Sequence, residues 1–356
     1  MRQIAESILN IFQNSGKKHL LVTGSKGSGK TTFVNELEMH FSNGNKLPGI
    51  VTYLVSNSRV MLREKRTDKK VCIGEMKHTM IPVEEGFLTL GVDALERAKL
   101  QNEEWILIDE LGFLESNNEE FKKAVREVFS EKRVLAVVRK QELPFLNELR
   151  EREDVMVVDM DDYHRKIGCV IMASGLGIRF GSNKLMADFK GKPLVQHILD
   201  TTQDVFEKRV VVTRSKEVEA LCKEQNIDVI FHTYPNRNDT VRLGTTHMSD
   251  MEACVFCPSD QPLLGKRTLQ KMRNAFSFEN LQIIRLAFGE TPGTPILFAN
   301  KYFEELKTLP EKKGGGYIVR KYPDEVSLVF AQSAKELYDI DTKEDLTKLE
   351  EMNADD

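Results

Sequence analysis

Residues 170–184 read VIMASGLGIRFGSNK, in which a short apolar run leads into a loop with three glycines. Glycines allow backbone N–H groups to turn inward and to approach an anion closely. Arg179 and Lys184 add positive charge within this loop and just after it. The pattern predicts a strand and a phosphate-binding loop, which we favour over an ordinary strand–loop–helix connection with incidental basic residues.

A dinucleotide-binding loop is the nearest alternative for this stretch. It requires the spacing G-x-G-x-x-G and an acidic residue about 20 positions further on, at the end of the next strand. Here the third glycine, Gly181, comes one residue late, and the candidate acid, Asp200, ends a helical stretch. A nicotinamide cofactor therefore fits the sequence poorly.

A second phosphate-binding motif lies near the start of the chain, in HLLVTGSKGSGKTTF (19–33). It is a complete P-loop pattern, G-x-x-x-x-G-K-[ST], between an expected strand and an expected helix. In such a loop main-chain donors surround the β-phosphate, the lysine reaches the β- and γ-phosphates, and the next hydroxyl suits Mg²⁺. The residues that we predict to bind this nucleotide are Gly24, Gly27, Ser28, Gly29, Lys30, Thr31 and Thr32.

The P-loop needs a carboxylate on the metal side, and WILIDE (105–110) supplies one. An apolar run that ends in acids is typical of a buried parallel strand whose carboxyl end reaches a site. We predict that Asp109 and Thr31 bind Mg²⁺ and that Glu110 orients or deprotonates the attacking water.

Length and composition limit the classes of protein that the chain can represent. At 356 residues two domains are expected, and we place them at 1–165 and 166–356. A net charge of −4 disfavours a general binder of nucleic acid or anionic membranes. The five cysteines suggest no disulfide framework, and neither a secretory signal nor an apolar run of about 20 residues occurs, so we expect a cytoplasmic protein.

The first half resembles the small nucleoside-triphosphatase family of P-loop proteins. Besides the P-loop it carries that family's PGI-x-T and IDE-x-G segments, as PGIVT (48–52) and IDELG (108–112). The resemblance covers most of residues 16–160. It implies a P-loop NTPase domain with a parallel sheet that hydrolyses an NTP, ATP or GTP, with Mg²⁺.

The second half resembles the molybdenum cofactor nucleotidyltransferases, which are cytidylyltransferases and guanylyltransferases. Later segments match as well, namely the Asp-Gln-Pro at 260–262, GTPILF (293–298) and DIDTKEDL (339–346). The family's opening signature, LxAGxGxRxGxxK, stands here as Met172, Ala173, Ser174, Gly175, Gly177, Arg179, Gly181 and Lys184. The resemblance implies a Rossmann-like sheet that loads an NTP and transfers a nucleotidyl group to the terminal phosphate of molybdopterin.

This resemblance also assigns roles to residues of the second half. Arg179, Lys184 and Asp260 are implied to be catalytic, with Asp260 binding Mg²⁺. The Asp341–Thr342 pair is explained by an N-cap, in preference to a metal or acceptor contact. The residues implied to bind the nucleotide are Ala173, Ser174, Gly175, Gly177, Thr240 and Arg242.

The base is suggested by Ser174, because the resemblance puts glycine there in guanylyltransferases and alanine in cytidylyltransferases. Serine is nearer to alanine in size, so we predict CTP rather than GTP. The predicted reaction is transfer of CMP to a molybdopterin-type acceptor with release of pyrophosphate, and a client molybdenum enzyme could be a partner. Two alternatives stay open, namely another acceptor such as a sugar phosphate, and a cofactor-binding chaperone driven by P-loop hydrolysis.

The cysteines and histidines that could bind a metal or carry out redox chemistry do not form a recognisable site in the sequence. Cys254 and Cys257 form C-x-x-C without the partners of a zinc or redox site, so we expect buried strand cysteines. The histidines of the second half have no ligand spacing, and we expect structural or exposed positions for His164, His197, His232 and His247.

Overall fold

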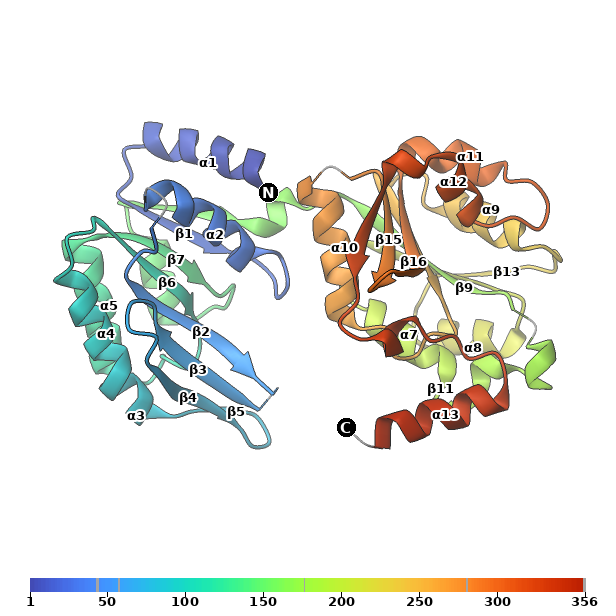
Figure 1. The fold of residues 1–356 in the computed structure, drawn as a ribbon, viewed down its shortest axis with the longest axis horizontal. Helices are drawn as coiled ribbons and strands as arrows, with labels where there is room; N and C mark the ends of the chain where they lie inside the picture. Colours follow the sequence, from blue (N-terminus) through green and yellow to red (C-terminus); the bar gives the residue numbers. More distant parts are fainter. Residues whose placement is uncertain (43–44, 57, 176, 280, 355–356) are drawn as a thin grey trace. The chain divides into compact units, whose positions relative to one another are not determined.

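The computed structural model describes residues 1–42, 45–56, 58–175, 177–279 and 281–354. It divides into two compact units, Met1–Tyr163 and His164–Asp356 (Figure 1). Each unit is built on its own largely parallel sheet, so the predicted pair of α/β domains is confirmed. In the described part of the chain, no helix combines the length and the apolar character that a membrane crossing requires.

The sheet of the first unit has the order β5-β4-β3-β2-β6-β7-β1-β8. Strands β2, β6, β7, β1 and β8 are parallel, and β3, β4 and β5 extend the sheet as antiparallel hairpins. The strands are β1 (His19–Thr23), β2 (Gly49–Val55), β3 (Arg59–Glu64), β4 (Lys70–Met76), β5 (Met80–Pro82), β6 (Trp105–Leu111), β7 (Arg133–Val138) and β8 (Val155–Asp159).

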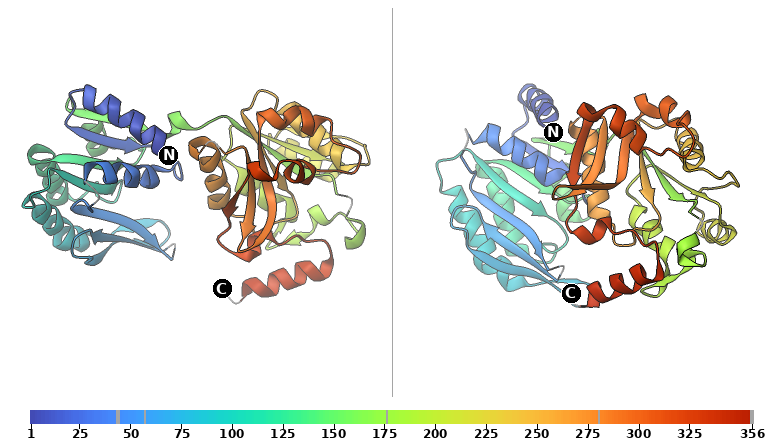
Figure 2. Two further views of the ribbon diagram at one scale, coloured as in Figure 1. Left: turned by 45° about the horizontal axis from the view of Figure 1, so that its top comes forward. Right: turned by 45° about the vertical axis from the view of Figure 1, so that its right-hand side comes forward.

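Alternation along these strands gives the first unit two apolar layers. Leu21, Ile106 and Ala136 belong to a cluster with side chains of α4, α5 and α6, whereas Leu20 and Leu135 are equally buried outside that cluster. Helices α4 and α5 lie side by side, as do α1 and α2 (Figures 1 and 2). The helices are α1 (Arg2–Asn14), α2 (Lys30–Phe41), α3 (Glu84–Gly86), the π-helix η1 (Phe87–Gly91), α4 (Val92–Lys99), α5 (Glu119–Glu131), α6 (Pro144–Arg150) and the 3₁₀ turn η2 (Met160–Tyr163).

The sheet of the second unit has the order β13-β12-β9-β14-β16-β15-β17, with β16 antiparallel to both of its neighbours. Val170 of the central strand β9 pairs with Val210 on one side and with Phe256 on the other. The strands are β9 (Ile167–Ala173), β12 (Lys208–Thr213), β13 (Val229–Phe231), β14 (Ala253–Pro258), β15 (Ile283–Phe288), β16 (Thr291–Ala299) and β17 (Val326–Phe330), and β10 (Asp188–Phe189) and β11 (Lys192–Pro193) form a separate hairpin. Cys254 and Cys257 are buried in β14, as predicted.

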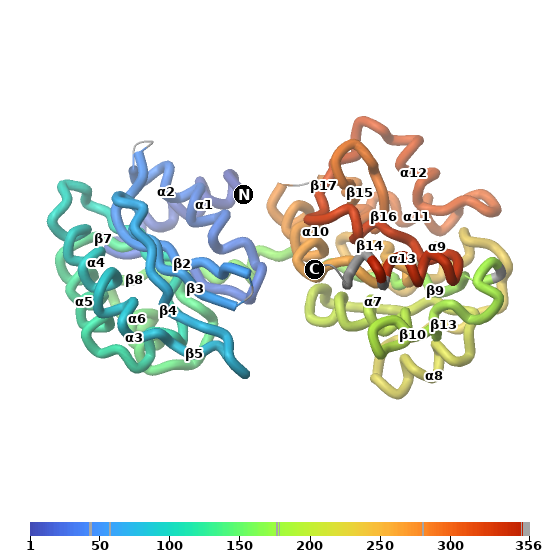
Figure 3. Tube along the Cα trace, turned by 60° about the horizontal axis from the view of Figure 1, so that its bottom comes forward, coloured from blue at the N-terminus to red at the C-terminus, as the bar shows by residue number. Residues whose placement is uncertain are grey.

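Helices pack on this sheet, and α9, α11 and α12 lie close to one another (Figures 1 and 3). The contact between α9 and the sheet is close, because a Cβ atom at Gly244 would lie 2.5 Å from Cγ1 of Val170. The helices are α7 (Leu194–Thr202), α8 (Lys216–Glu224), α9 (Arg237–His247), α10 (Lys266–Glu279), α11 (Phe303–Lys307), α12 (Gly316–Lys321) and α13 (Lys343–Ala354). The short 3₁₀ turns are η3 (Ile178–Phe180), η4 (Lys184–Met186), η5 (Asn300–Tyr302), η6 (Pro323–Glu325) and η7 (Ala334–Leu337).

His19 makes the stability of the first unit dependent on pH. Its side chain is fully buried, Nδ1 accepts from the N–H of Val134 at 3.2 Å, and Nε2 lies 3.1 Å from Asp154. Burial lowers the pKa of His19 to about 4, although Asp154 opposes the shift. The unfolded chain, with a pKa near 6.5, therefore takes up this proton before the folded chain does.

We predict that the first unit is destabilised as the pH falls from 6.5 towards 4, by about 2 kcal/mol between pH 7 and pH 5. Urea unfolding at the two pH values measures this loss. In His19→Gln, which keeps a polar side chain but cannot titrate, the pH dependence should shrink. An equal dependence in the variant would show that other groups cause it.

Candidate functional site

The P-loop of the first unit connects β1 to α2, and its glycines adopt backbone conformations that other residues rarely adopt. Gly27 and Gly29 have φ values of 81° and 94°, in the left-handed region that favours glycine. Nζ of Lys30 donates to the carbonyl oxygens of Gly24 at 2.9 Å and Ser25 at 2.8 Å, so the ammonium group lies across the loop. The predicted Ser28 lies within this loop, and Thr31 and Thr32 stand in the first turn of α2.

Carboxylates of β6 lie close to this loop. Asp109 is buried, and burial raises its pKa to about 6, with Glu110 adding to the shift and a hydrogen bond from Thr31 opposing it. Burial lowers the pKa of Lys30, and Glu110 and Asp161 oppose that shift. The Thr31 hydroxyl and the Asp109 carboxylate thus lie together, and oxygen ligands of this kind suit Mg²⁺.

Two contacts near the P-loop were not predicted from the sequence. Nε of Arg139 lies 2.5 Å from Oε1 of Glu110, so a cation already holds the carboxylate that we expect to orient water. The backbone N–H and the hydroxyl of Ser25 donate to Oδ2 of Asp161 at 2.9 and 2.7 Å. Asp161 belongs to η2, the last turn of the first unit, and Lys140 lies 3.2 Å from the same oxygen.

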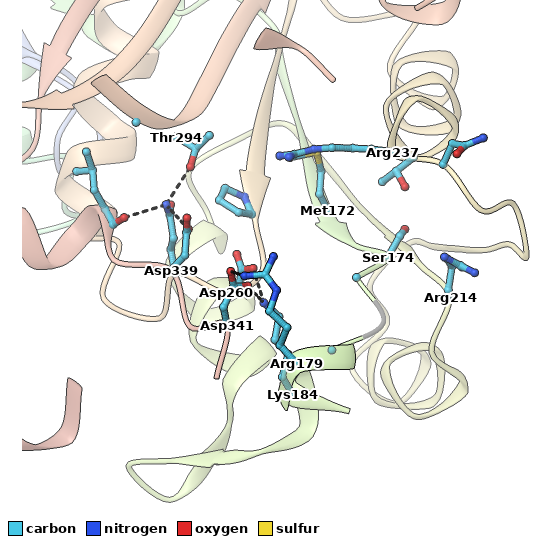
Figure 4. A pocket seen from close by; sticks show the side chains of 18 of the residues that line it. Met172, Ser174, Arg179, Lys184, Arg214, Arg237, Asp260, Thr294, Asp339 and Asp341 are labelled. Atoms are coloured by element: carbon cyan, nitrogen blue, oxygen red, sulfur yellow. Dashed lines mark hydrogen bonds and ion pairs between the residues drawn. The ribbon is translucent and has the colours of Figure 1, made fainter. Parts of the chain in front are cut away.

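In the second unit, loops at the carboxyl ends of β9, β12 and β14 surround a cavity of about 890 Å³ (Figure 4). Ligands collect at this edge in open α/β sheets. Predicted residues that line it are Ser174, Gly175, Gly177, Arg179, Lys184, Thr240 and Asp260. The structure therefore brings most of the predicted transferase residues together.

Lys184 stands at the centre of a cluster of acidic and basic side chains on one side of this cavity. Its side chain is only 7% exposed, and Nζ donates to Asp260 Oδ2 at 2.8 Å, to Asp341 Oδ1 at 3.0 Å and to the carbonyl oxygen of Ile340 at 2.7 Å. Burial by itself would lower the pKa of Lys184, but Asp260 and Asp341 outweigh it and raise the pKa. Arg179 reaches the other oxygen of Asp341 at 3.1 Å.

The N-cap that we expected of the Asp341–Thr342 pair comes from Thr342, and Asp341 plays a different part. Its carboxylate faces Lys184 and Arg179, whereas the cap of α13 comes from the next residues. Oγ1 of Thr342 accepts from the N–H of Asp345, whose carboxylate accepts from the N–H of Thr342 at 2.9 Å. Asp260 and Asp341 thus offer converging carboxylates that suit a divalent cation, although the described residues contain no cluster of three or more His, Cys, Asp or Glu side chains for one.

The other side of the cavity is basic. Figure 4 shows Ser174 and Arg214 on the side away from Asp260 and Asp341, and Arg237 also lines the cavity. Within the described residues, no carboxylate lies within ion-pair distance of either arginine. Arg214 follows directly after strand β12, so its place at a strand's carboxyl end is a signal that could have identified it from the sequence.

Two predicted nucleotide contacts lie outside the cavity lining. Ala173 is the buried last residue of β9. Arg242 pairs with Asp239 at 3.5 Å, and its guanidinium lies 5.4 Å from the ring centre of Tyr234. Their expected contacts with the nucleotide stay predictions.

In a comparison with known proteins, each half of the chain matches a family model. Residues 19–169 match the family model described as NTPase, and residues 169–326 match the model described as MobA-like NTP transferase domain. The nucleoside-triphosphatase THEP1 of Thermotoga maritima is 28% identical over 158 residues, which is 41% of this chain and 88% of that protein. The probable molybdenum cofactor guanylyltransferase of Aquifex aeolicus is 24% identical over 195 residues, which is 51% of this chain and 89% of that protein.

Among solved structures, the molybdopterin-guanine dinucleotide biosynthesis protein A of Archaeoglobus fulgidus is similar with a TM-score of 0.44 and 18% identity. The similarity covers 53% of this chain and 100% of that one.

The geometry of the P-loop gives a direct prediction. Lys30→Ala removes the cation that lies across the loop, so NTP hydrolysis by the first unit should fall by about 100-fold. Orthophosphate release from ATP and from GTP, with Mg²⁺, measures this activity. Lys46→Ala, at an exposed lysine of the same unit, is the matched control and should leave hydrolysis unchanged. Equal losses in both variants would contradict the assigned role of Lys30.

Proposed function

Since this chain joins an NTPase domain to a MobA-like NTP transferase domain, we propose that the second domain transfers CMP from CTP to a phosphate group of a molybdopterin-type acceptor. Pyrophosphate is the other product. The two family matches confirm the fusion that the motifs predict, and both families are enzymes that use NTPs. The base, the acceptor and the residue roles are the proposal.

The observation that carries the proposal is the contact of Lys184 with both Asp260 and Asp341 at the end of the glycine-rich loop. In the reaction, an oxygen of the acceptor phosphate forms a bond to the α-phosphorus of CTP. The bond from that phosphorus to the bridging oxygen of the β-phosphate breaks, and pyrophosphate leaves with the electron pair. The attacking oxygen is already ionised at pH 7, so no strong general base is needed.

Catalysis in this proposal comes from positioning and from charge neutralisation. Backbone amides of the loop and the side chains of Arg179 and Lys184 donate to phosphate oxygens. The carboxylates of Asp260 and Asp341 would hold Mg²⁺, which when bound offsets negative charge on the phosphates. Asp341 is added to the predicted metal residues because its carboxylate meets the same ammonium group as Asp260.

Support for CTP comes from the size of Ser174, which is nearer to the alanine expected in cytidylyltransferases than to glycine. For the first domain we propose Mg²⁺-dependent hydrolysis of ATP or GTP, with Thr31 and Asp109 on the metal and Glu110 on the water. This hydrolysis could supply energy for cofactor handling or for delivery to a client molybdenum enzyme. A cytoplasmic location stays a prediction from the sequence.

The decisive measurement is pyrophosphate release with Mg²⁺ and each of CTP, GTP, ATP and UTP, with and without molybdopterin, with orthophosphate followed separately. We expect release that requires CTP and the acceptor, that is lost in Asp260→Ala and that survives in Lys30→Ala. Asp324→Ala, at an exposed aspartate of the same unit, is the control for Asp260→Ala. Orthophosphate alone, lost in Lys30→Ala, would instead favour a cofactor-binding chaperone, and pyrophosphate with a sugar phosphate would identify another acceptor.

Substitution of Lys184 tests the centre of the site separately. Lys184→Met keeps the length of the side chain but removes the charge that Asp260 and Asp341 share, so transfer should fall by about 100-fold or more. Steady-state pyrophosphate release measures the loss, and thermal unfolding shows whether the variant is folded. The exposed Lys348 provides the control, Lys348→Met, which should keep full activity. Normal turnover in a folded Lys184→Met protein would remove Lys184 from the mechanism.

A further inference from the structure

Arg139 follows strand β7, which lies between β6 and β1 in the first sheet (Figure 1). Val137 of β7 pairs with Asp109 of β6 on one side and with Val22 of β1 on the other. The three strands are parallel, so their carboxyl ends lie at the same edge of the sheet. Arg139 is therefore placed between the acids that follow β6 and the P-loop that follows β1.

The side chain of Arg139 is held by the turn after β6. Its backbone N–H donates to the carbonyl oxygen of Leu111 at 2.9 Å. The stem of the side chain lies against Gly112, because a Cβ atom there would be 2.8 Å from Cδ of Arg139. The guanidinium carbon lies 5.8 Å from the ring centre of Phe113, and Nε donates to Oε1 of Glu110 at 2.5 Å. The guanidinium group is thus fixed beside the carboxylate that we propose to act on the water.

Most of the hydrogen-bond donors of Arg139 are left for a ligand. Arginine has five N–H donors in a planar fork, and Nε provides only one of them. Of the residues that the structure describes, only Glu110 accepts a side-chain hydrogen bond from Arg139, whose side chain is 40% exposed. The next cation along the chain differs in this respect, because the ammonium group of Lys140 pairs with Asp159 at 2.7 Å and with Asp161 at 3.2 Å.

Arg139 also lies close to the cation of the P-loop. Burial lowers the pKa of Lys30, and the positive charge of Arg139 adds to that shift. In a P-loop this lysine reaches the β- and γ-phosphates. Two like charges that lie close together repel each other, and a bound triphosphate would offset both of them. The position of Arg139 therefore suits contact with the same phosphates.

We propose that Arg139 is a catalytic residue of the NTPase domain, in which Nη1 and Nη2 contact the γ-phosphate while Nε holds Glu110. This inference rests on the proposed hydrolysis in the first domain. In that reaction a water oxygen forms a bond to the γ-phosphorus. The bond from this phosphorus to the oxygen that bridges to the β-phosphate breaks, and the diphosphate leaves with the electron pair. One proton of the water passes to Glu110 and then to solvent.

A cation at this place stabilises the negative charge that grows on the leaving oxygen during the reaction. The planar guanidinium group of Arg139 would also hold the carboxylate that orients the water and the phosphate that the water attacks. Glu110 alone could orient the water but could not offset the charge. Because the contact gains strength in the transition state, Arg139 should affect kcat more than KM.

Hydrolysis of ATP and of GTP by the full chain, followed as orthophosphate release with Mg²⁺, is the first test. Arg139→Ala should lower kcat by about 100-fold or more with little change in KM. The matched control is Arg126→Ala, because Arg126 is also 40% exposed and its Nε likewise pairs with a glutamate, Glu148, at 2.7 Å. This control should keep the kcat of the unaltered chain. An unchanged kcat in Arg139→Ala overturns the inference.

A second measurement separates contact with phosphate from an indirect role through Glu110. Aluminium fluoride with ADP or GDP imitates the transferred phosphoryl group, and transition-state analogues bind more tightly than substrates. Calorimetry with Mg²⁺ gives the gain in affinity that aluminium fluoride causes, in the unaltered chain and in Glu110→Gln. Arg139→Ala should remove most of this gain in both proteins. A gain that Glu110→Gln abolishes by itself, or that Arg139→Ala leaves unchanged in Glu110→Gln, means that Arg139 acts only through Glu110 and overturns the contact.

Lys30→Ala shows how much of each signal does not come from the P-loop, and thermal unfolding shows whether each variant is folded. Hydrolysis that depends on Lys30 but not on Arg139 removes this inference and leaves the proposed hydrolysis intact. If the unaltered chain releases no orthophosphate from either NTP and aluminium fluoride causes no gain in affinity, the proposed hydrolysis fails, and the inference fails with it.

Discussion

The site of the second unit depends on one buried ammonium group. Nζ of Lys184 contacts carboxylates from two segments that are far apart in the sequence, Asp260 after β14 and Asp341 before α13. A buried cation of this kind is costly unless it is paired and hydrogen-bonded. Its three acceptors meet that requirement, and they also fix the glycine-rich loop against the two segments that carry the acids. The same contacts therefore organise the fold around the cavity and set its charge.

The charged groups divide the cavity into two regions. Acids gather with Lys184 at one side, whereas Arg214 lies at the other (Figure 4). Among the described residues, neither Arg214 nor Arg237, which also lines the cavity, has a carboxylate within ion-pair distance. The carboxylates of the first region suit a divalent cation, and the positive charge of the second favours anionic groups.

The features that could be predicted from the sequence are those that depend on short motifs and on the alternation of strands and helices. The P-loop, the acids after β6 and β14 and the glycine-rich loop after β9 all lie at strand ends, where alternating strands and helices put them. Contacts between residues that are far apart in the chain could not be predicted from the sequence. The segment DIDTKEDL predicted the N-cap that Thr342 provides, but not the contact between Asp341 and Lys184. His232 shows the same limit, because no ligand spacing relates it to Ser174, and only the adjacent strands β9, β12 and β13 bring the two side chains together.

The hydrogen bonds of Asp161 have a bearing on where the two domains can be separated. Asp161 lies beyond the last strand of the first unit. If the domain border were placed at the end of the sheet, this residue would belong to the linker. Its carboxylate nevertheless accepts from the backbone and the hydroxyl of Ser25 inside the P-loop. A fragment that ended at Asp159 would keep every strand of the sheet and still lack the carboxylate that accepts these hydrogen bonds from the P-loop. The functional border of the NTPase thus lies past its final strand, close to the point where the transferase begins.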